Sequence, residues 1–459
     1  MYRVYNNYGP YHPKNLIMKK PILTILLALS AYAASAAGLT FSGSQSVDIQ
    51  PDKSTGLDCI YVLENSANAT ATYTAASSSA TVRWYKFGNS GGAYAVEIPC
   101  TVSGLQRSVN VGPDDTGYII EEGDRRAYYW VTNYANHPFD INGLDIAAAD
   151  TDCLSVALAP QGQGDRMVYY TINGASKEID RQITVSYNTL VYDRDSEYFA
   201  QSAVNQSFAY LSPLMRVEAP LCDTAFRLSG DRFLRAWGRD EAVESAYYHT
   251  KAISAETTAV QTERDNDNES GSNTGGLGGS APVEITFNAA ITDAVRFTEW
   301  QFAADPNFDN IDLRFNQTEL TYTFKEYGTT YVRFVASNND GDCDVYGPTY
   351  QVDVGESKLL CPNAFSPGSS EGVNDEWKVS YKSIISFECH IFNRWGTKII
   401  TLTDPSQGWD GRYKGKLVPA GVYYYVIKAV GSDGHKYNLS GDINIVNHRA
   451  YSSPSQPVE

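Results

Sequence analysis

Histidines are few in this chain, and none lies in a catalytic motif. Beyond residue 36 the histidines are His137, His249, His390, His435 and His448. None of them lies in a G-x-S-x-G, H-E-x-x-H or cysteine-protease context. His390 follows Cys389 on an expected strand, so the two side chains point to opposite faces and form no pair. We therefore expect a protein that is not an enzyme.

Carboxylates supply two further kinds of chemistry. Acid pairs for glycoside hydrolysis converge from distant positions, so Glu241 and Glu244 near Trp237 are one conceivable pair beside the simpler interpretation of a solvated loop. A secreted hydrolase with its active site in residues 37–221 is thus an alternative. Hard oxygen ligands suit calcium, whereas acidic turns are also common without it. The calcium candidates are Asp305, Asp309, Asp312, Asp340, Asp342 and Asp344. No other cofactor is expected.

Seven cysteines make disulfides the next question. All lie beyond residue 36, no C-x-x-C occurs, and no Cys/His cluster has zinc-ligand spacing. An odd count leaves at least one thiol unpaired or paired between chains. The disulfide candidates are Cys59, Cys100, Cys153, Cys222, Cys343 and Cys361, with Cys389 as the seventh cysteine.

Composition limits the class of protein that must position these residues. The 459 residues suggest three or four domains, and 33 Tyr and 17 Phe favour strands over helices. The formal net charge of −17 excludes a nucleic-acid partner, because affinity for phosphate backbones rests on Lys and Arg.

An export signal is expected at residues 18–36. Lys19 and Lys20 precede an apolar run, and Ala34-Ser35-Ala36 supplies the small residues before a cleavage site. The alternative, a membrane-spanning helix, needs about 20 apolar residues, and neither this run nor any later one is that long. Residues 1–17 are polar and fit an over-called start. The mature protein is therefore expected to be exported, with no transmembrane segment.

Short alternating segments broken at Gly, Asn, Asp or Pro predict an all-β fold of tandem sandwiches. We expect immunoglobulin-like domains at 37–145 and 146–221 and a third domain at 222–356. Cys59, Trp84 and Cys100 follow the order of the immunoglobulin bridge and its tryptophan, or are three unrelated buried residues. A helix of one or two turns is expected within 231–248. The run 264–282 has almost no apolar residue and predicts a flexible loop.

The third domain resembles polycystic-kidney-disease-type (PKD) immunoglobulin-like domains. The matching residues are Trp300, Tyr322, Thr323, Phe324, Gly328, Val332, Phe334, Asn338, Gly341 and Cys343. The resemblance implies a spacer or ligand-binding module.

A small antiparallel sandwich is expected at 357–459. It contains P-N-A-F-S-P, G-V-N-D, F-N-R-W-G, W-D-G and P-A-G-V-Y-Y-Y in that order. These motifs resemble the type B, gliding-motility-associated (CHU_C-like) C-terminal sorting domain of the Bacteroidota type IX secretion system. One departure is the loop 368–371. The motif residues are Pro362, Asn363, Phe365, Pro367, Asn374, Asp375, Phe392, Asn393, Trp395, Gly396, Trp409, Asp410, Gly411, Pro419, Gly421, Tyr423 and Tyr425.

This resemblance implies export to the periplasm, then passage across the outer membrane to the cell surface or the medium. It implies two partners, the type IX translocon and a PorP/SprF-like outer-membrane protein. The expected function is binding or adhesion at the surface. The segments around 375–387 and 404–416 are also similar to the PorA-type shuttle component of the attachment complex, so a machinery role with lipopolysaccharide as partner is a second alternative.

Overall fold

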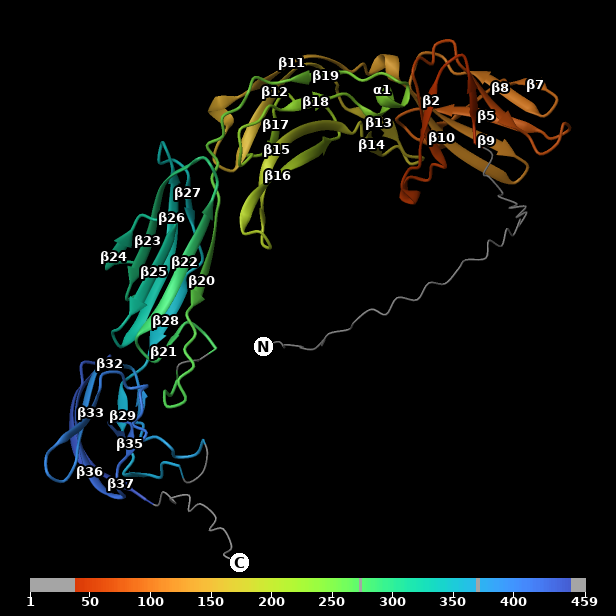
Figure 1. The fold of residues 1–459 in the computed structure, drawn as a ribbon. Coiled ribbons are helices and arrows are strands. Elements are labelled where there is room, and N and C mark those ends of the chain that lie inside the picture. The colour runs from red at the N-terminus through yellow and green to blue at the C-terminus, as the bar shows by residue number, and fades with distance from the viewer. Residues whose placement is uncertain (1–37, 272–274, 369–371, 447–459) are drawn as a thin grey trace, which may run out of the picture.

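The computed structural model describes residues 38–271, 275–368 and 372–446, and within them almost all regular structure is β. Four modules follow one another in a curved row (Figure 1). The predicted all-β fold of tandem sandwiches is confirmed. Within the described ranges the single α-helix is α1 (Arg232–Ala236), in the segment where a short helix was expected, and no helix there could span a membrane. The expected export signal lies outside the described residues.

The first module is a sandwich of two sheets, in the strand orders β1-β4-β8-β7 and β2-β3-β10-β9-β5-β6. Its core contains Trp84, Tyr118 and Tyr129 between the sheets. The strands are β1 (Thr40–Ser42), β2 (Ser46–Ile49), β3 (Cys59–Leu63), β4 (Thr70–Thr74), β5 (Val82–Phe87), β6 (Val96–Ile98), β7 (Thr101–Ser103), β8 (Gln106–Asn110), β9 (Thr116–Glu122) and β10 (Arg125–Asn133).

The expected immunoglobulin bridge between Cys59 and Cys100 is wrong, because both thiols are free. Cys59 begins β3 and Cys100 follows β6, and these strands are four positions apart in one sheet. Four strand spacings are about 19 Å, and a disulfide needs Cα atoms within about 7 Å. Trp84 pairs across to Ile98 in the same sheet, so it does not pack on an inter-sheet bridge.

The second module contains the sheets β11-β12-β17, β13-β14 and β16-β15-β18-β19. Strands β18 and β19 come after residue 222 but belong to the sheet of β15. Strand β18 pairs with β15, and β19 pairs with β18. The expected boundary at 221/222 is therefore wrong, and this module continues to about residue 249. The strands are β11 (Asp140–Ile146), β12 (Ser155–Gln163), β13 (Met167–Tyr170), β14 (Ser176–Ile179), β15 (Ile183–Asp193), β16 (Tyr198–Phe208), β17 (Met215–Glu218), β18 (Arg227–Ser229) and β19 (Ala242–Glu244).

The first two modules share one hydrophobic core. A single cluster of buried residues runs from Ile60 and Trp130 in the first module to Val185 and Phe226 in the second. Beside it Arg181 and Asp231 form an ion pair at 2.8 Å, and both side chains are 0% exposed. The hydroxyl of Tyr134 donates to Asp231 at 3.0 Å. An ion pair without solvent access needs these extra hydrogen bonds to offset desolvation, so this joint is held in one geometry.

The third module has the sheets β20-β22-β25 and β21-β28-β26-β23-β24, with β27 on β26. Trp300 and Phe287 lie in the core between them. The strands are β20 (Ala255–Gln261), β21 (Gly278–Gly279), β22 (Val283–Ile291), β23 (Val295–Ala303), β24 (Leu313–Phe315), β25 (Glu319–Phe324), β26 (Gly328–Asn338), β27 (Asp344–Tyr346) and β28 (Tyr350–Val354).

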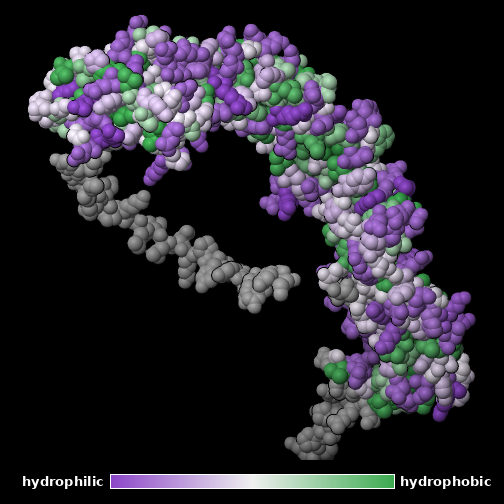
Figure 2. Space-filling view, turned by 180° about the vertical axis from the view of Figure 1, so that it is seen from behind, coloured by the Kyte–Doolittle hydropathy of each residue, from purple (hydrophilic) through white to green (hydrophobic). Residues whose placement is uncertain are grey.

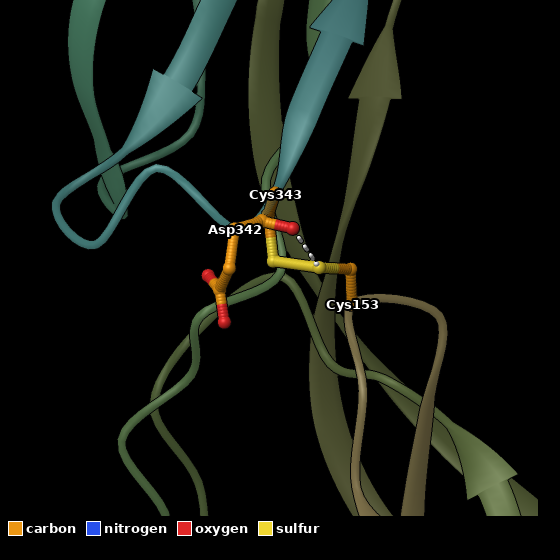
Figure 3. Close-up of side chains that lie close together, drawn as sticks. All are labelled: Cys153, Asp342 and Cys343. Carbon is orange, nitrogen blue, oxygen red and sulfur yellow. Dashed lines mark hydrogen bonds between the residues drawn. A yellow bond between two sulfur atoms is a disulfide. The ribbon is translucent and has the colours of Figure 1, made fainter.

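A disulfide joins the second module to the third. Cys153, before β12, bonds to Cys343, before β27 (Figure 3). Lys251 forms an ion pair with Asp342 at 3.0 Å beside it. Two of the six expected disulfide candidates are thus paired, while Cys59, Cys100, Cys222 and Cys361 are free, as is Cys389.

The C-terminal module is a small sandwich whose main sheet has the order β30-β37-β36-β32-β33. Trp377, Trp409 and Ile427 lie in its core. The strands are β29 (Lys358–Leu360), β30 (Ala364–Phe365), β31 (Ser380–Lys382), β32 (Ile384–Phe392), β33 (Lys398–Leu402), β34 (Arg412–Tyr413), β35 (Lys416–Leu417), β36 (Gly421–Gly431) and β37 (Lys436–Ile445).

The flexible loop expected at 264–282 is wrong for the part that the structure describes. Residues 268–270 run beside β31 of the C-terminal module, and β21 pairs with β28 of the third. The polar side chains that suggested a solvated linker instead bind backbone groups of the neighbouring module. On the face shown in Figure 2, hydrophilic residues alternate with small hydrophobic areas along the row.

Candidate functional site

Most aromatic motif residues of the C-terminal module build its core. Trp409 is fully buried between Phe365 and Tyr423, with ring centroids 5.4 and 5.2 Å away. Its indole N–H donates to the carbonyl of Arg412 at 3.0 Å. Gly411 lies at φ 74° against Pro367, where a side chain would meet both backbone strain and the proline ring. These motif positions are explained by packing.

The acidic motif residue Asp375 organises the loop after β30. Its carboxylate accepts the backbone N–H groups of Gly368 at 3.0 Å and Gly372 at 2.7 Å. The N–H of Ser366 donates to the carbonyl of Asn374, which has a positive φ of 55°. These bonds tie the described residues on both sides of the loop to Asp375 and Asn374.

The turn between β32 and β33 presents Trp395 to solvent. The side-chain oxygen of Asn393 accepts the N–H groups of Trp395 at 3.0 Å and Thr397 at 2.9 Å. Gly396 completes the turn at φ 80°. Trp395 is 74% exposed, more than any other aromatic of the motifs: Tyr424 is 46% exposed, and Phe365, Phe392, Trp409, Tyr423 and Tyr425 are buried or half-buried. Local hydrogen bonds therefore hold an aromatic side chain outward that folding does not require.

A pocket of about 260 Å³ lies beside Trp395. Its walls come from the β32–β33 turn, from Tyr413 on β34 and from the start of β36. Pro419 contributes through its carbonyl, which accepts the hydroxyl of Tyr423 at 3.0 Å and so fixes the turn into β36. The lining residues are Asn393, Arg394, Trp395, Ile399, Tyr413, Val418, Pro419, Ala420, Gly421, Val422 and Tyr423.

Two cations accompany the aromatic rings of the pocket: Arg394 lines it, and Lys414 lies against the ring of its lining residue Tyr413. The guanidinium carbon of Arg394 lies 4.3 Å from the ring centroid of Trp395, and Lys414 Nζ lies 5.4 Å from that of Tyr413. Neither cation forms an ion pair with any described residue. Burial raises the pKa of Tyr423, and the nearby Arg394 opposes this rise. An aromatic surface with two available cations suits a partner that presents apolar and anionic groups.

The motif residues predicted from sequence thus divide into three groups. Phe365, Pro367, Trp409, Gly411 and Tyr423 are buried. Asp375, Phe392, Asn393 and Tyr425 are half-buried, and the exposed residues are Pro362, Asn363, Asn374, Trp395, Gly396, Asp410, Pro419 and Gly421.

The six calcium candidates do not gather at one point. Asp305 uses its carboxylate to accept the N–H groups of Asn307 and Asp309 in its own turn. Asp342 is engaged by Lys251 and Asn338. Among the described residues, the one group of three possible metal ligands is Cys153, Asp342 and Cys343, and its sulfurs form the disulfide (Figure 3). Calcium binding at Asp305, Asp309, Asp312, Asp340, Asp342 and Asp344 stays a prediction without a built site.

The residues considered for catalysis have different surroundings. Glu241 has one buried carboxylate oxygen without a partner in the described structure, and burial raises its pKa. Glu244 is exposed and faces Arg227. Cys389 is fully buried, which raises its pKa to about 12, while His390 on the next position bonds to Thr401.

Sequence reasoning missed that Tyr413 lines the pocket and that Lys414 lies against its ring. Both lie in the hairpin β34–β35, which follows the W-D-G motif. The signal was present as an aromatic and a cation in G-R-Y-K-G-K, but only the folded hairpin brings them to the β32–β33 turn.

Comparisons with known protein families match two parts of the chain, the second module and the C-terminal module. Residues 359–445 match the CHU_C type IX secretion signal domain, and residues 145–245 match a fibronectin type III domain. The C-terminal module is therefore a type IX sorting domain, which directs export to the cell surface or the extracellular space. Among curated proteins none matches the chain.

Three of the solved structures with some similarity to this chain contain tandem modules. One is the tetra-tandem repeat in the extending region of a large adhesion protein, with 12% identity, 83% of this chain and 97% of that chain covered, and a TM-score of 0.20. Another is the three N-terminal domains of the bacteriophage RB49 Highly Immunogenic Outer Capsid protein, with 9% identity, 68% of this chain and 100% of that chain covered, and a TM-score of 0.21. A third is the I9–I11 tandem from titin, with 11% identity, 63% of this chain and 94% of that chain covered, and a TM-score of 0.13.

Proposed function

We propose that this chain is a non-catalytic binding or adhesion protein of the cell surface, and that the pocket beside Trp395 is where the secretion machinery binds its sorting domain. The exposure of Trp395 carries the second half of the proposal. A motif whose other aromatics serve packing keeps this one in solvent, on a turn that Asn393 holds fixed. Large aromatic side chains in such positions are frequent anchors of protein interfaces.

The partner at this pocket is an outer-membrane protein of the PorP/SprF kind, acting with the type IX translocon. The available cations Arg394 and Lys414 favour a partner surface with acidic groups around an apolar centre. After transport the same contact would retain the protein at the cell surface.

The ligand-binding half of the proposal rests on the first module. Its two sheets end on one side in the edge strands β6 and β7, which are joined by two residues. Tyr94, Val96 and Val102 lie along this edge and are 76%, 67% and 61% exposed. An exposed apolar edge with unpaired backbone groups suits an added strand or an apolar ligand surface. Figure 1 places β7 at the end of the row farthest from the sorting domain.

The test compares three tryptophan and tyrosine variants of the full chain in a host with the type IX machinery. Trp395→Ala should leave the melting temperature unchanged and reduce the surface and medium fraction at least fivefold. Trp409→Ala should reduce both stability and export, because it removes a core side chain. Tyr247→Ala, an exposed aromatic in the second module, is the control and should change neither. Normal export of Trp395→Ala would refute the proposal.

A role in the attachment machinery is the second candidate, because lipopolysaccharide is anionic and two available cations accompany the aromatic rings of the pocket. A lipopolysaccharide pull-down with the full chain distinguishes the two. Retention that is lost in the Arg394→Gln, Lys414→Gln double variant would favour the shuttle, and absence of retention would favour the surface protein.

A further inference from the structure

The segment Arg264–Gly271, here named the docking segment, belongs to the third module in sequence but contacts the sorting domain. Asn268 donates through its side chain to the carbonyls of Val379 and Pro405, both at 2.8 Å. Its own carbonyl accepts the N–H of Tyr381 at 3.0 Å, and the N–H of Ser270 donates back to the carbonyl of Tyr381 at 2.9 Å. Residues 268–270 therefore pair with β31 as a short third strand opposite β29.

A buried carboxylate marks the centre of this contact. The side chain of Glu269 is 0% exposed and forms an ion pair with Arg264 at 2.8 Å. It also accepts hydrogen bonds from Asn266 at 2.9 Å and from the hydroxyl of Tyr381 at 3.2 Å. Burial, with Glu269 as the next cause, raises the pKa of Tyr381. A carboxylate enclosed in this way is costly without all of its partners, one of which the sorting domain supplies.

Further bonds join the two modules around the docking segment. The N–H of Ser383 donates to the hydroxyl of Ser280 at 2.7 Å, and the N–H of Tyr327 donates to the carbonyl of Ser432 at 3.0 Å. Lys378 forms an ion pair with Asp267 at 3.3 Å. The residues that match the secretion signal domain begin only at 359, so all of these partners from the third module lie upstream of that match.

We propose that the functional sorting unit is larger than the matched domain and includes the docking segment as an added strand on β31. Without the docking segment, the backbone groups on the outer edge of β31 would be unpaired, and the side chain of Tyr381 would be more exposed to solvent. The machinery would then meet a looser domain with an unpaired strand edge, which favours aggregation over transport. The proposal rests on the sorting domain and is independent of the role of Trp395.

The experiment uses the full chain. In one variant residues 266–270 are replaced by Gly-Ser-Gly-Ser-Gly, and a milder variant is Asn268→Ala. Hydrogen exchange of the backbone N–H groups in 379–383 should accelerate at least tenfold in the first variant and severalfold in the second. Export should fall at least threefold in the first, while exchange in the first module stays unchanged.

Asn339→Ala is the matched control, because Asn339 lies in the same module and its side chain bonds only to Asp340 among the described residues. It should change neither exchange nor export. Unaltered exchange in 379–383 would overturn the added strand. Faster exchange with full export would overturn the larger sorting unit. Reduced export of Trp395→Ala with normal exchange would separate a fault at the pocket from a fault at the docking segment.

Discussion

Cys153 and Cys343 are 190 residues apart in sequence, yet their disulfide ties the loop before β12 to the loop before β27. It is one of three joints that each use a different device. A shared core joins the first two modules, and Tyr134, which follows β10, bonds to the buried ion pair of the second module. The disulfide joins the next pair, and the docking segment joins the last. We infer that these three joints restrict bending of the row of four modules.

Loss of this disulfide should weaken the central joint. In the Cys153→Ala, Cys343→Ala double variant, the free energy of unfolding of the second and third modules should fall by about 2–4 kcal/mol, because the unfolded chain regains the freedom that the cross-link removes. Urea unfolding measures it. Cys100→Ala, at a free and half-buried thiol, is the control and should cost less than half as much. Equal losses would contradict a special role for the bridge.

The joint between the first two modules should depend on its buried ion pair. Asp231→Asn should lower the free energy of unfolding by about 3–5 kcal/mol, because Arg181 is left buried without its counter-charge. Thermal unfolding of the full chain measures this loss. Asp240→Asn removes an exposed partner of Arg227 at 3.6 Å and should cost less than about 1 kcal/mol. A similar effect of both variants would argue against the joint described here.

Acid should remove the contribution of Asp342. The hydrogen bond from Asn338 and the ion pair with Lys251 hold the pKa of Asp342 below its ordinary value of 3.8. A lowered pKa means that the stabilisation is complete above pH 3.8 and is lost as the pH falls through the folded-state value. The difference in urea midpoint between the natural chain and Asp342→Asn should be clear at pH 6 and vanish near pH 2. A difference that persists at pH 2 would show that the carboxylate charge is not the cause.

Two glycines separate backbone strain from packing in the sorting domain. Gly411 and Gly434 have almost the same φ, 74° and 75°, but only at Gly411 would an added Cβ approach a neighbour, at 2.9 Å from Pro367. Gly434→Ala should therefore cost about 1 kcal/mol from strain alone, and Gly411→Ala clearly more. Chemical denaturation of the two variants measures the costs. Equal costs would mean that Pro367 moves aside freely.

Much of this architecture could be predicted from the chain itself. Alternating apolar residues and Gly-rich turns gave the sandwiches, and the ordered C-terminal motifs gave the sorting domain, which the match to residues 359–445 confirms. The order of the motifs alone could not show that Trp409 is buried and Trp395 exposed, because burial depends on which side of a turn a residue occupies. The pairing of Cys153 with Cys343 also has no local signal, since it arises from how two modules meet.

The wrong boundaries have related causes. Polarity at 264–282 suggested a solvated loop, but Asn268 and Glu269 bond to groups that lie more than 100 residues away. The break near Cys222 suggested a new domain, yet β18 and β19 return to the edge of β15. Sequence patterns indicate local strands well. They do not show which sheet a strand joins.

The central claim is that the secretion machinery contacts the sorting domain at Trp395. A photo-crosslinking amino acid placed at Trp395 in living cells, and separately at Tyr247 as an exposed control site in the second module, tests this contact directly. We predict a covalent adduct with an outer-membrane protein from position 395 and none from position 247. An exported chain that gives no adduct at 395, or equal adducts at both positions, would contradict the account.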